Sequence, residues 1–94
     1  MNITPKDYNK LSWTERRQLR EQYIEEQNGN CQYCGCSLDS SPSEQVTKLA
    51  INVKLFPEEF FKYPVHLHHD HETNMTIGAV HNVCNAVLWQ YEGK

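Results

Sequence analysis

Long apolar runs are missing from this chain of 94 residues. A helix that crosses a bilayer needs roughly 20 predominantly apolar residues, and no stretch of the sequence approaches that length. The N-terminal segment also lacks the charged-then-apolar pattern of a secretory signal. These absences exclude a membrane partner at the level of sequence and predict a soluble, cytoplasmic protein.

Positive charge is also scarce. The chain carries 9 basic and 12 acidic side chains, which gives a formal net charge of -3. A protein that coats nucleic acid without regard to sequence needs an excess of lysine and arginine. Any contact with DNA must therefore be made by a local group of side chains. The length suits one compact folding unit, so we predict a single domain over residues 1–94.

The first third of the chain predicts a lead-in followed by a helix. Residues 1–10 are mixed and polar, and we expect them to drape over the domain. Ser12 and Glu15 form a capping-box pattern, which predicts an amphipathic helix within residues 11–28. Its apolar side chains fall roughly along one side: Trp13, Leu19, Tyr23 and Ile24.

The rest of the chain predicts a spacer, a hairpin and a final helix. The spacer covers residues 37–64, and its stretch 46–56 is compatible with either a strand or a short helix. Two short extended runs, 65–71 and 75–80, predict a β-hairpin. A helix is expected from near Cys84, with Leu88 and Tyr91 in the core. The fold class is therefore α+β.

The strongest chemical signal is a pair of ligand pairs. Cys31 and Cys34 are separated by two residues, and so are His81 and Cys84. This spacing lets one tight turn present two donors to a tetrahedral Zn²⁺ ion. Two disulfides are the alternative in a secreted chain, but without a signal sequence we favour thiolates around structural zinc. Because so short a chain buries little apolar surface, we expect the zinc-free protein to be largely unfolded.

Cys36 offers a different donor set. It could replace His81 to make an all-cysteine site, although a ligand immediately beside the turn at Cys34 strains the geometry, so we favour His81. A further alternative is that the thiols are buried packing residues. The doubled spacing argues against that interpretation.

Histidines crowd the segment between the two ligand pairs. Four histidines and one aspartate fall within six positions: His66, His68, His69, Asp70 and His71. Imidazole binds transition metals and transfers protons near neutral pH, whereas a solvated histidine-rich strand is the plainer alternative. Successive side chains of a regular strand point to opposite faces. Joint action of His68 and His69 at one site therefore predicts irregular backbone there.

These motifs together resemble the HNH endonucleases of the ββα-metal, or His-Me finger, superfamily, and most closely its small phage-type branch of recombination endonucleases. The parts that carry the resemblance occur in order: Cys31-x-x-Cys34, His68-His69-Asp70-His71, and the run from Gly78 through His81 and Cys84 to Asn85. The resemblance implies a zinc-stapled ββα-metal core over residues 31–89 behind an N-terminal helix. It also implies metal-dependent cleavage of DNA phosphodiester bonds, by nicking or by double-strand cutting.

The resemblance also assigns roles to single residues. His69 matches the general base that deprotonates the attacking water. His68 and Asn85 match the ligands of one divalent catalytic metal, such as Mg²⁺, Mn²⁺ or Ni²⁺. At the position of His68 many relatives have aspartate, although the His-His form also occurs in the family, and at the position of His81 most zinc-bearing relatives have cysteine. Thr76 falls near the position of the middle asparagine of the family name.

Substrate contacts are expected around this site. Asp70 and His71 could orient substrate or hydrogen-bond to the metal ligands, and ordinary surface polarity accounts for them equally well. Arg16, Arg17 and Arg20 on the first helix are candidate phosphate contacts. Neighbouring glutamates argue instead for an ordinary solvated helix face.

DNA is the expected partner, and a homodimer or a phage packaging partner is also compatible with the sequence. The phage-type resemblance implies a protein that acts inside a bacterial host. Two rival functions remain. One is a catalytically silent zinc module that binds nucleic acid or a protein, against which the intact His69 and Asn85 argue. The other is an accessory nuclease subunit of a phage packaging machine.

Overall fold

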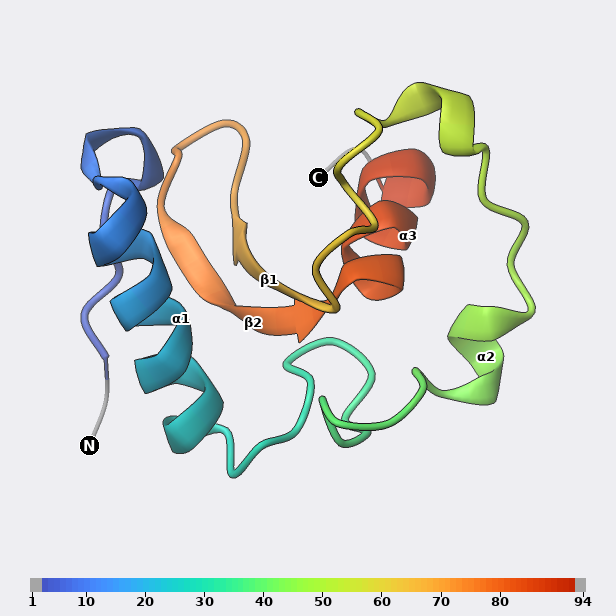
Figure 1. Cartoon of the computed structure of the whole chain (residues 1–94), viewed down its shortest axis with the longest axis horizontal. Coiled ribbons are helices and arrows are strands. Elements are labelled where there is room, and N and C mark those ends of the chain that lie inside the picture. Colours follow the sequence, from blue (N-terminus) through green and yellow to red (C-terminus); the bar gives the residue numbers. More distant parts are fainter. Residues whose placement is uncertain (1–2, 93–94) are drawn as a thin grey trace.

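A two-stranded antiparallel sheet lies between helices in the computed structural model, which describes residues 3–92 (Figure 1). The first two and last two residues of the predicted domain fall outside that range. The elements follow in the order η1 (Tyr8–Lys10), α1 (Trp13–Glu26), α2 (Glu44–Thr47), η2 (Val53–Leu55), β1 (Val65–His69), β2 (Thr76–His81) and α3 (Asn82–Glu92). Helix α1 flanks the hairpin on one side and α3 on the other (Figure 1). The predicted α+β class is confirmed.

Helix α1 begins at the predicted capping box. The Ser12 hydroxyl accepts a hydrogen bond from the Glu15 backbone N–H at 3.2 Å, and the Glu15 carboxylate accepts one from the Ser12 N–H at 2.9 Å. Leu19 and Tyr23 are buried as expected. Trp13 was expected on the same side but is 81% exposed, because it lies in the first turn and lines a surface cleft instead.

The predicted hairpin is present, with an irregularity at the predicted place. Strand β1 pairs antiparallel with β2, and the register shifts between His68 and His69. His68 pairs with Gly78 whereas His69 pairs with Thr76, so the register skips Ile77. The irregular backbone expected between the two histidines is therefore confirmed, and its extra residue belongs to β2.

The spacer contains no strand among the described residues. The stretch that was compatible with either strand or helix forms the short helix α2 and the 3₁₀ turn η2. Helix α3 begins at Asn82, two residues before the expected Cys84. Leu88 is buried, but Tyr91 is 50% exposed, because its hydroxyl donates to the Ala50 carbonyl and so ties the spacer to α3.

The core lies where α1, the hairpin and α3 meet. Its buried side chains are Leu19, Tyr23, Cys31, Leu38, Val46, Leu67, Ala79, Val80, Cys84 and Val87. Within residues 3–92, the helices are all too short or too polar to cross a membrane. The two cysteines in this list mark the place where the core meets the metal-ligand cluster.

Gly78 lies where the C-terminal end of α1 meets β2. The Gln27 side chain donates to the Ala79 carbonyl and accepts from the Ala79 N–H, both at 2.9 Å. A Cβ atom on Gly78 would lie 2.8 Å from the Gln27 Oε1 atom and 2.9 Å from the Cγ atom of Gln32. The Gln27 side chain cannot move away without breaking these hydrogen bonds.

We therefore expect Gly78→Ala to lower the free energy of unfolding by about 1–3 kcal/mol, the usual cost of overpacking. Chemical denaturation of the zinc-loaded protein measures the effect. Ile77→Ala, at the 38% exposed neighbouring position, is the control and should cost less. A Gly78→Ala protein as stable as the wild type would contradict the close approach of Gln27 to β2.

Candidate metal centre and histidine cleft

Three cysteines and one histidine come together below the hairpin: Cys31, Cys34, His81 and Cys84. Cys31 and Cys34 lie in the loop after α1. His81 is the last residue of β2, and Cys84 lies in the first turn of α3. Their ligand atoms all lie within 4.8 Å of one another. Tetrahedral zinc with bonds of about 2.3 Å to sulfur separates its ligand atoms by roughly 3.8 Å. These four residues are therefore placed to hold a metal ion such as zinc.

The His81 ring is oriented for ligation through Nδ1. Its Nδ1 atom lies 3.5 Å from the Cys34 sulfur and 3.6 Å from the Cys84 sulfur. Its Nε2 atom lies 2.8 Å from the Ser37 carbonyl oxygen and 2.9 Å from the Ser40 carbonyl oxygen. Carbonyl oxygens only accept hydrogen bonds, so the proton resides on Nε2 and the lone pair of Nδ1 faces the sulfurs.

Two thiols of the cluster, those of Cys31 and Cys84, shift each other's pKa through a hydrogen bond. All four cysteines of the chain are free thiols rather than disulfides. A hydrogen bond from the Cys84 thiol lowers the pKa of Cys31 to about 4, and the same contact raises the pKa of Cys84. A thiolate is therefore favoured at Cys31, and thiolate is the form of cysteine that binds metals.

Cys36 does not belong to the ligand cluster. Its carbonyl oxygen accepts a hydrogen bond from the Cys31 N–H at 2.7 Å, and the Gly35 N–H donates to the Cys31 carbonyl at 3.0 Å. Gly35 has a φ of 80°, a left-handed conformation that glycine adopts without strain. Cys36 thus helps to close the knuckle through its backbone, and His81 rather than Cys36 is placed as the fourth candidate donor.

This arrangement predicts different outcomes for two matched substitutions. Cys36→Ser should leave one tightly bound zinc ion per chain, because the Cys36 thiol lies outside the four-residue ligand cluster. Cys34→Ser should lose tight zinc binding, because it removes a sulfur donor. Zinc released by acid and measured with a chromogenic chelator gives the stoichiometry. Equal zinc loss in both variants would overturn the assignment of His81 in place of Cys36.

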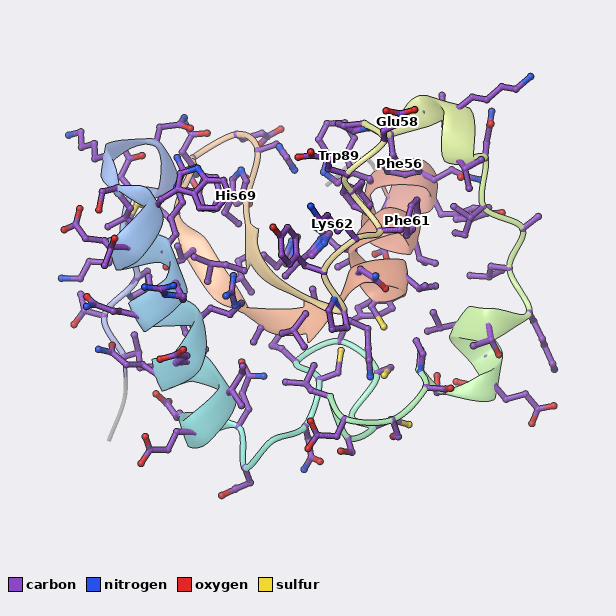
Figure 2. The ribbon with its side chains drawn as sticks, in the orientation of Figure 1. Phe56, Glu58, Phe61, Lys62, His69 and Trp89 are labelled. Atoms are coloured by element: carbon purple, nitrogen blue, oxygen red, sulfur yellow. The ribbon has the colours of Figure 1, made fainter. Side chains whose placement is uncertain are left out.

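A second feature is a cleft of about 730 Å³, which we call the histidine cleft. Helix α1 and the hairpin line one side of it, and the spacer and α3 line the other. The predicted functional residues that line it are Arg16, Arg17, Arg20, His69, His71 and Asn85, together with His66. His68, the other predicted ligand of the catalytic metal, is 3% exposed and is not among the residues that line the cleft, although its neighbours Leu67 and His69 are. Figure 2 shows His69 beside α1 and the hairpin, with Trp89 and Phe56 toward α3 and the spacer. Thus the arginines predicted to contact phosphate share a cleft with the predicted base.

Asn85 projects from the first half of α3 and is 9% exposed. Its Nδ2 atom lies 3.1 Å from Nδ1 of His66, whose pKa is lowered by burial. No hydrogen-bond partner among residues 3–92 reaches the buried Asn85 Oδ1 atom. A buried carbonyl oxygen without a donor costs about 1–3 kcal/mol, and a hard divalent cation would satisfy it. This oxygen therefore fits the predicted metal-ligand role.

His69 lies against aromatic rings on the cleft wall. The Tyr8 ring stacks on it with centroids 3.9 Å apart and planes 10° apart, and the His71 ring lies 4.6 Å away. Burial, reinforced by the nearby His71 and His68, lowers the pKa of His69 to about 4. The imidazole is therefore neutral at neutral pH, which is the form that accepts a proton.

Sequence reasoning did not find Tyr8. The Cζ atom of the Arg16 guanidinium lies 3.9 Å from the centroid of the Tyr8 ring. The Nε and Nη2 atoms of Arg16 also donate hydrogen bonds to the Tyr8 carbonyl at 3.1 and 3.0 Å. The Tyr8 N–H donates to the Asn74 carbonyl at 2.7 Å, beside a β-bridge that joins Asp7 to Met75. The lead-in thus does drape over the hairpin, and it delivers a ring to His69.

The residues expected near the metal ligands have separate places. The Asp70 carboxylate closes the hairpin turn by accepting from the Glu72 N–H at 2.7 Å and the Thr73 N–H at 3.2 Å. The exposed His71 lines the cleft. Thr76 is buried, and its hydroxyl lies 3.0 Å from that of Tyr23. Thr76 therefore links the hairpin to α1 rather than facing the cleft.

Comparison with known proteins assigns no function to these features. No family model, no curated protein and no solved structure matches the chain. The metal-ligand cluster and the cleft are therefore interpreted from their own chemistry, and the resemblance to HNH endonucleases stays a hypothesis based on the order of the motifs.

Proposed function

We propose that the chain is a metal-dependent endonuclease of the HNH type, which hydrolyses phosphodiester bonds in DNA. One observation carries the proposal: the candidate base His69 and the candidate metal ligand Asn85 line the same cleft as three arginines of α1. Cleavage of a phosphodiester needs a base for water and positive charge near the phosphoryl oxygens. The cleft supplies groups suited to both tasks.

The charge of the cleft supports DNA as the substrate. Its lining includes three arginines and a single carboxylate, Glu59. The cleft is therefore locally positive although the chain as a whole has a net charge of -3. Arg17 and Arg20 add guanidinium groups that can each present parallel N–H donors to a phosphate. Such a local patch is what the acidic composition requires of a DNA-cleaving protein.

In the proposed mechanism, the neutral His69 imidazole takes a proton from the attacking water. Tyr8 stacks on that ring and holds its plane, while the arginines bind and orient the phosphate. His68 and the Oδ1 atom of Asn85 would hold a divalent cation. When bound, such a cation neutralises the charge that develops on the phosphoryl and leaving oxygens.

Tyr8 is expected to act as a positioning residue. Tyr8→Ala should slow single-turnover cleavage by about tenfold or more, because the His69 ring loses the surface that fixes its orientation. Tyr8→Phe keeps the ring and should retain most of the rate. Cleavage by Tyr8→Ala at the wild-type rate would show that the stack has no part in catalysis.

Relaxation of supercoiled plasmid by the zinc-loaded protein tests the proposed function. We expect nicked or linear product with at least one of Mg²⁺, Mn²⁺ and Ni²⁺, and none without an added cation. Asn85→Ala should lose the activity, whereas Gln45→Ala removes an exposed amide on α2 and should keep it. No cleavage with any cation would favour the silent zinc module. An inactive protein that still binds a second cation would favour the partner-dependent accessory subunit.

A further inference from the structure

Large aromatic rings are exposed around the mouth of the cleft. Trp13, Tyr63 and Trp89 all line it, with exposed fractions of 81%, 50% and 47%. They come from α1, the spacer and α3, so three separate segments deliver rings to one place. Tryptophan is normally buried over most of its surface. This concentration of exposed rings therefore indicates a binding surface.

Trp89 is held firmly at this surface. Its ring lies 4.4 Å from that of His71 at an interplanar angle of 77°, and 6.5 Å from that of Phe56 at 72°. Phe56 in turn packs on Phe60, with centroids 4.6 Å apart. These edge contacts orient Trp89 beside His71. An aromatic face that is already oriented loses little conformational freedom when a flat ligand stacks on it.

The rings and the arginines define the chemistry of the ligand. Arg16, Arg17 and Arg20 suit phosphate groups, and the exposed rings suit a planar base. In duplex DNA the faces of each base are covered by its stacked neighbours, so such rings can engage a base only when it is unpaired or turned out of the helix. A cleft of about 730 Å³ falls in the range of roughly 300–1,000 Å³ that encloses small organic ligands.

We propose that the cleft binds an unpaired nucleotide of a single DNA strand, with its base on Trp89 and its phosphate on Arg17 and Arg20. The inference deepens the proposed function, on which it rests for the identity of the substrate. It also gives the spacer, which places Tyr63 and Phe56 at the cleft, a role in selecting unpaired strands.

Fluorescence anisotropy tests the proposal without any cleavage. The zinc-loaded protein, with no other divalent cation, is titrated into an end-labelled DNA strand of about 12 nucleotides, a length suited to single-strand sites. The same strand annealed to its complement is the comparison. We expect the single strand to bind at least about tenfold more tightly, because stacking on an aromatic ring gives roughly 5- to 150-fold per base. Equal or tighter binding of the duplex would overturn the proposal.

Substitutions of Trp89 locate the binding site. Trp89→Ala should weaken single-strand binding by about fivefold or more, whereas Trp89→Phe retains an aromatic face and most of the affinity. Tyr33→Ala removes a 40% exposed ring outside the cleft lining and should bind as the wild type. Unchanged binding by Trp89→Ala, in a protein that keeps its zinc, would also overturn the proposal.

Intrinsic fluorescence gives an independent readout. The chain has two tryptophans, so Trp13→Phe leaves Trp89 as the only one. Its emission should be quenched on addition of the single strand, and lack of quenching at saturation would contradict stacking on this ring.

Selective single-strand binding without plasmid cleavage would refute the proposed nuclease and leave this inference standing. Cleavage without single-strand preference would do the opposite.

Discussion

Removal of zinc is expected to unfold most of the chain. The four ligands join the loop after α1 to the end of β2 and the start of α3, which otherwise share a small core. Structural zinc supplies an apparent binding free energy of about 10–16 kcal/mol in small domains. That is as large as the total stability of a typical folded domain, about 5–15 kcal/mol. Little cooperative structure should therefore survive without the metal.

Circular dichroism and size-exclusion chromatography during chelation measure this effect. The helical signal should fall and the hydrodynamic radius should rise, and both should recover when zinc is added back. Cys84→Ser should resemble the chelated wild type because it removes a donor from the cluster. A metal-free protein that keeps its helical signal and melts cooperatively would contradict the structural role of the cluster.

His69→Ala is expected to lower the rate of DNA cleavage by about 10²–10⁴-fold, the usual contribution of a general base. Zinc content and DNA binding should stay near the wild-type values, because His69 belongs neither to the metal-ligand cluster nor to the arginine group. Single-turnover cleavage at saturating protein separates the chemical step from binding.

His71→Ala is the matched control for this prediction. His71 lies beside His69 in the same cleft, but it is exposed and was not assigned as the base. It should lose less than about tenfold in rate if it only orients substrate. A greater loss for His71→Ala than for His69→Ala would show that the base has been assigned to the wrong histidine.

Features set by short sequence separations could be predicted from the sequence. The capping box acts within one helical turn, so Ser12 and Glu15 located the start of α1. The two-residue spacing of Cys31 and Cys34 fixes the knuckle in the same way. The irregular register beside His68 followed from strand alternation combined with the expectation that His68 and His69 act at one site. The capping box and the knuckle depend on local geometry that distant parts of the chain do not alter.

Contacts between distant segments could not be predicted in this way. Nothing around Tyr8 in the sequence marks its stack on His69, because the two meet only when the lead-in pairs with the hairpin. Helical periodicity placed Trp13 and Tyr91 among the apolar side chains, but both are largely exposed. Their surroundings depend on where the spacer and the cleft lie, and a single sequence gives no signal for that.

The position of the α1 arginines at the cleft also could not be predicted from the sequence around them. Nearby glutamates on α1 favoured an ordinary solvated face, whereas Arg16, Arg17 and Arg20 all line the histidine cleft. The packing of α1 on the hairpin decides this, since it sets which face of the helix meets the cleft. Charge counted along the sequence therefore underestimates the positive charge that a substrate would meet there.

Anomalous scattering from crystals of zinc-loaded His69→Ala, grown with Mn²⁺ and a DNA oligonucleotide, tests the central claim most directly. The central claim is that a second metal and a phosphate meet in the histidine cleft. We predict a zinc peak among Cys31, Cys34, His81 and Cys84. We also predict a separate manganese peak bound by His68 and the Oδ1 atom of Asn85, next to a DNA phosphate. Manganese and phosphate bound away from the cleft, with the zinc site filled, would contradict the account.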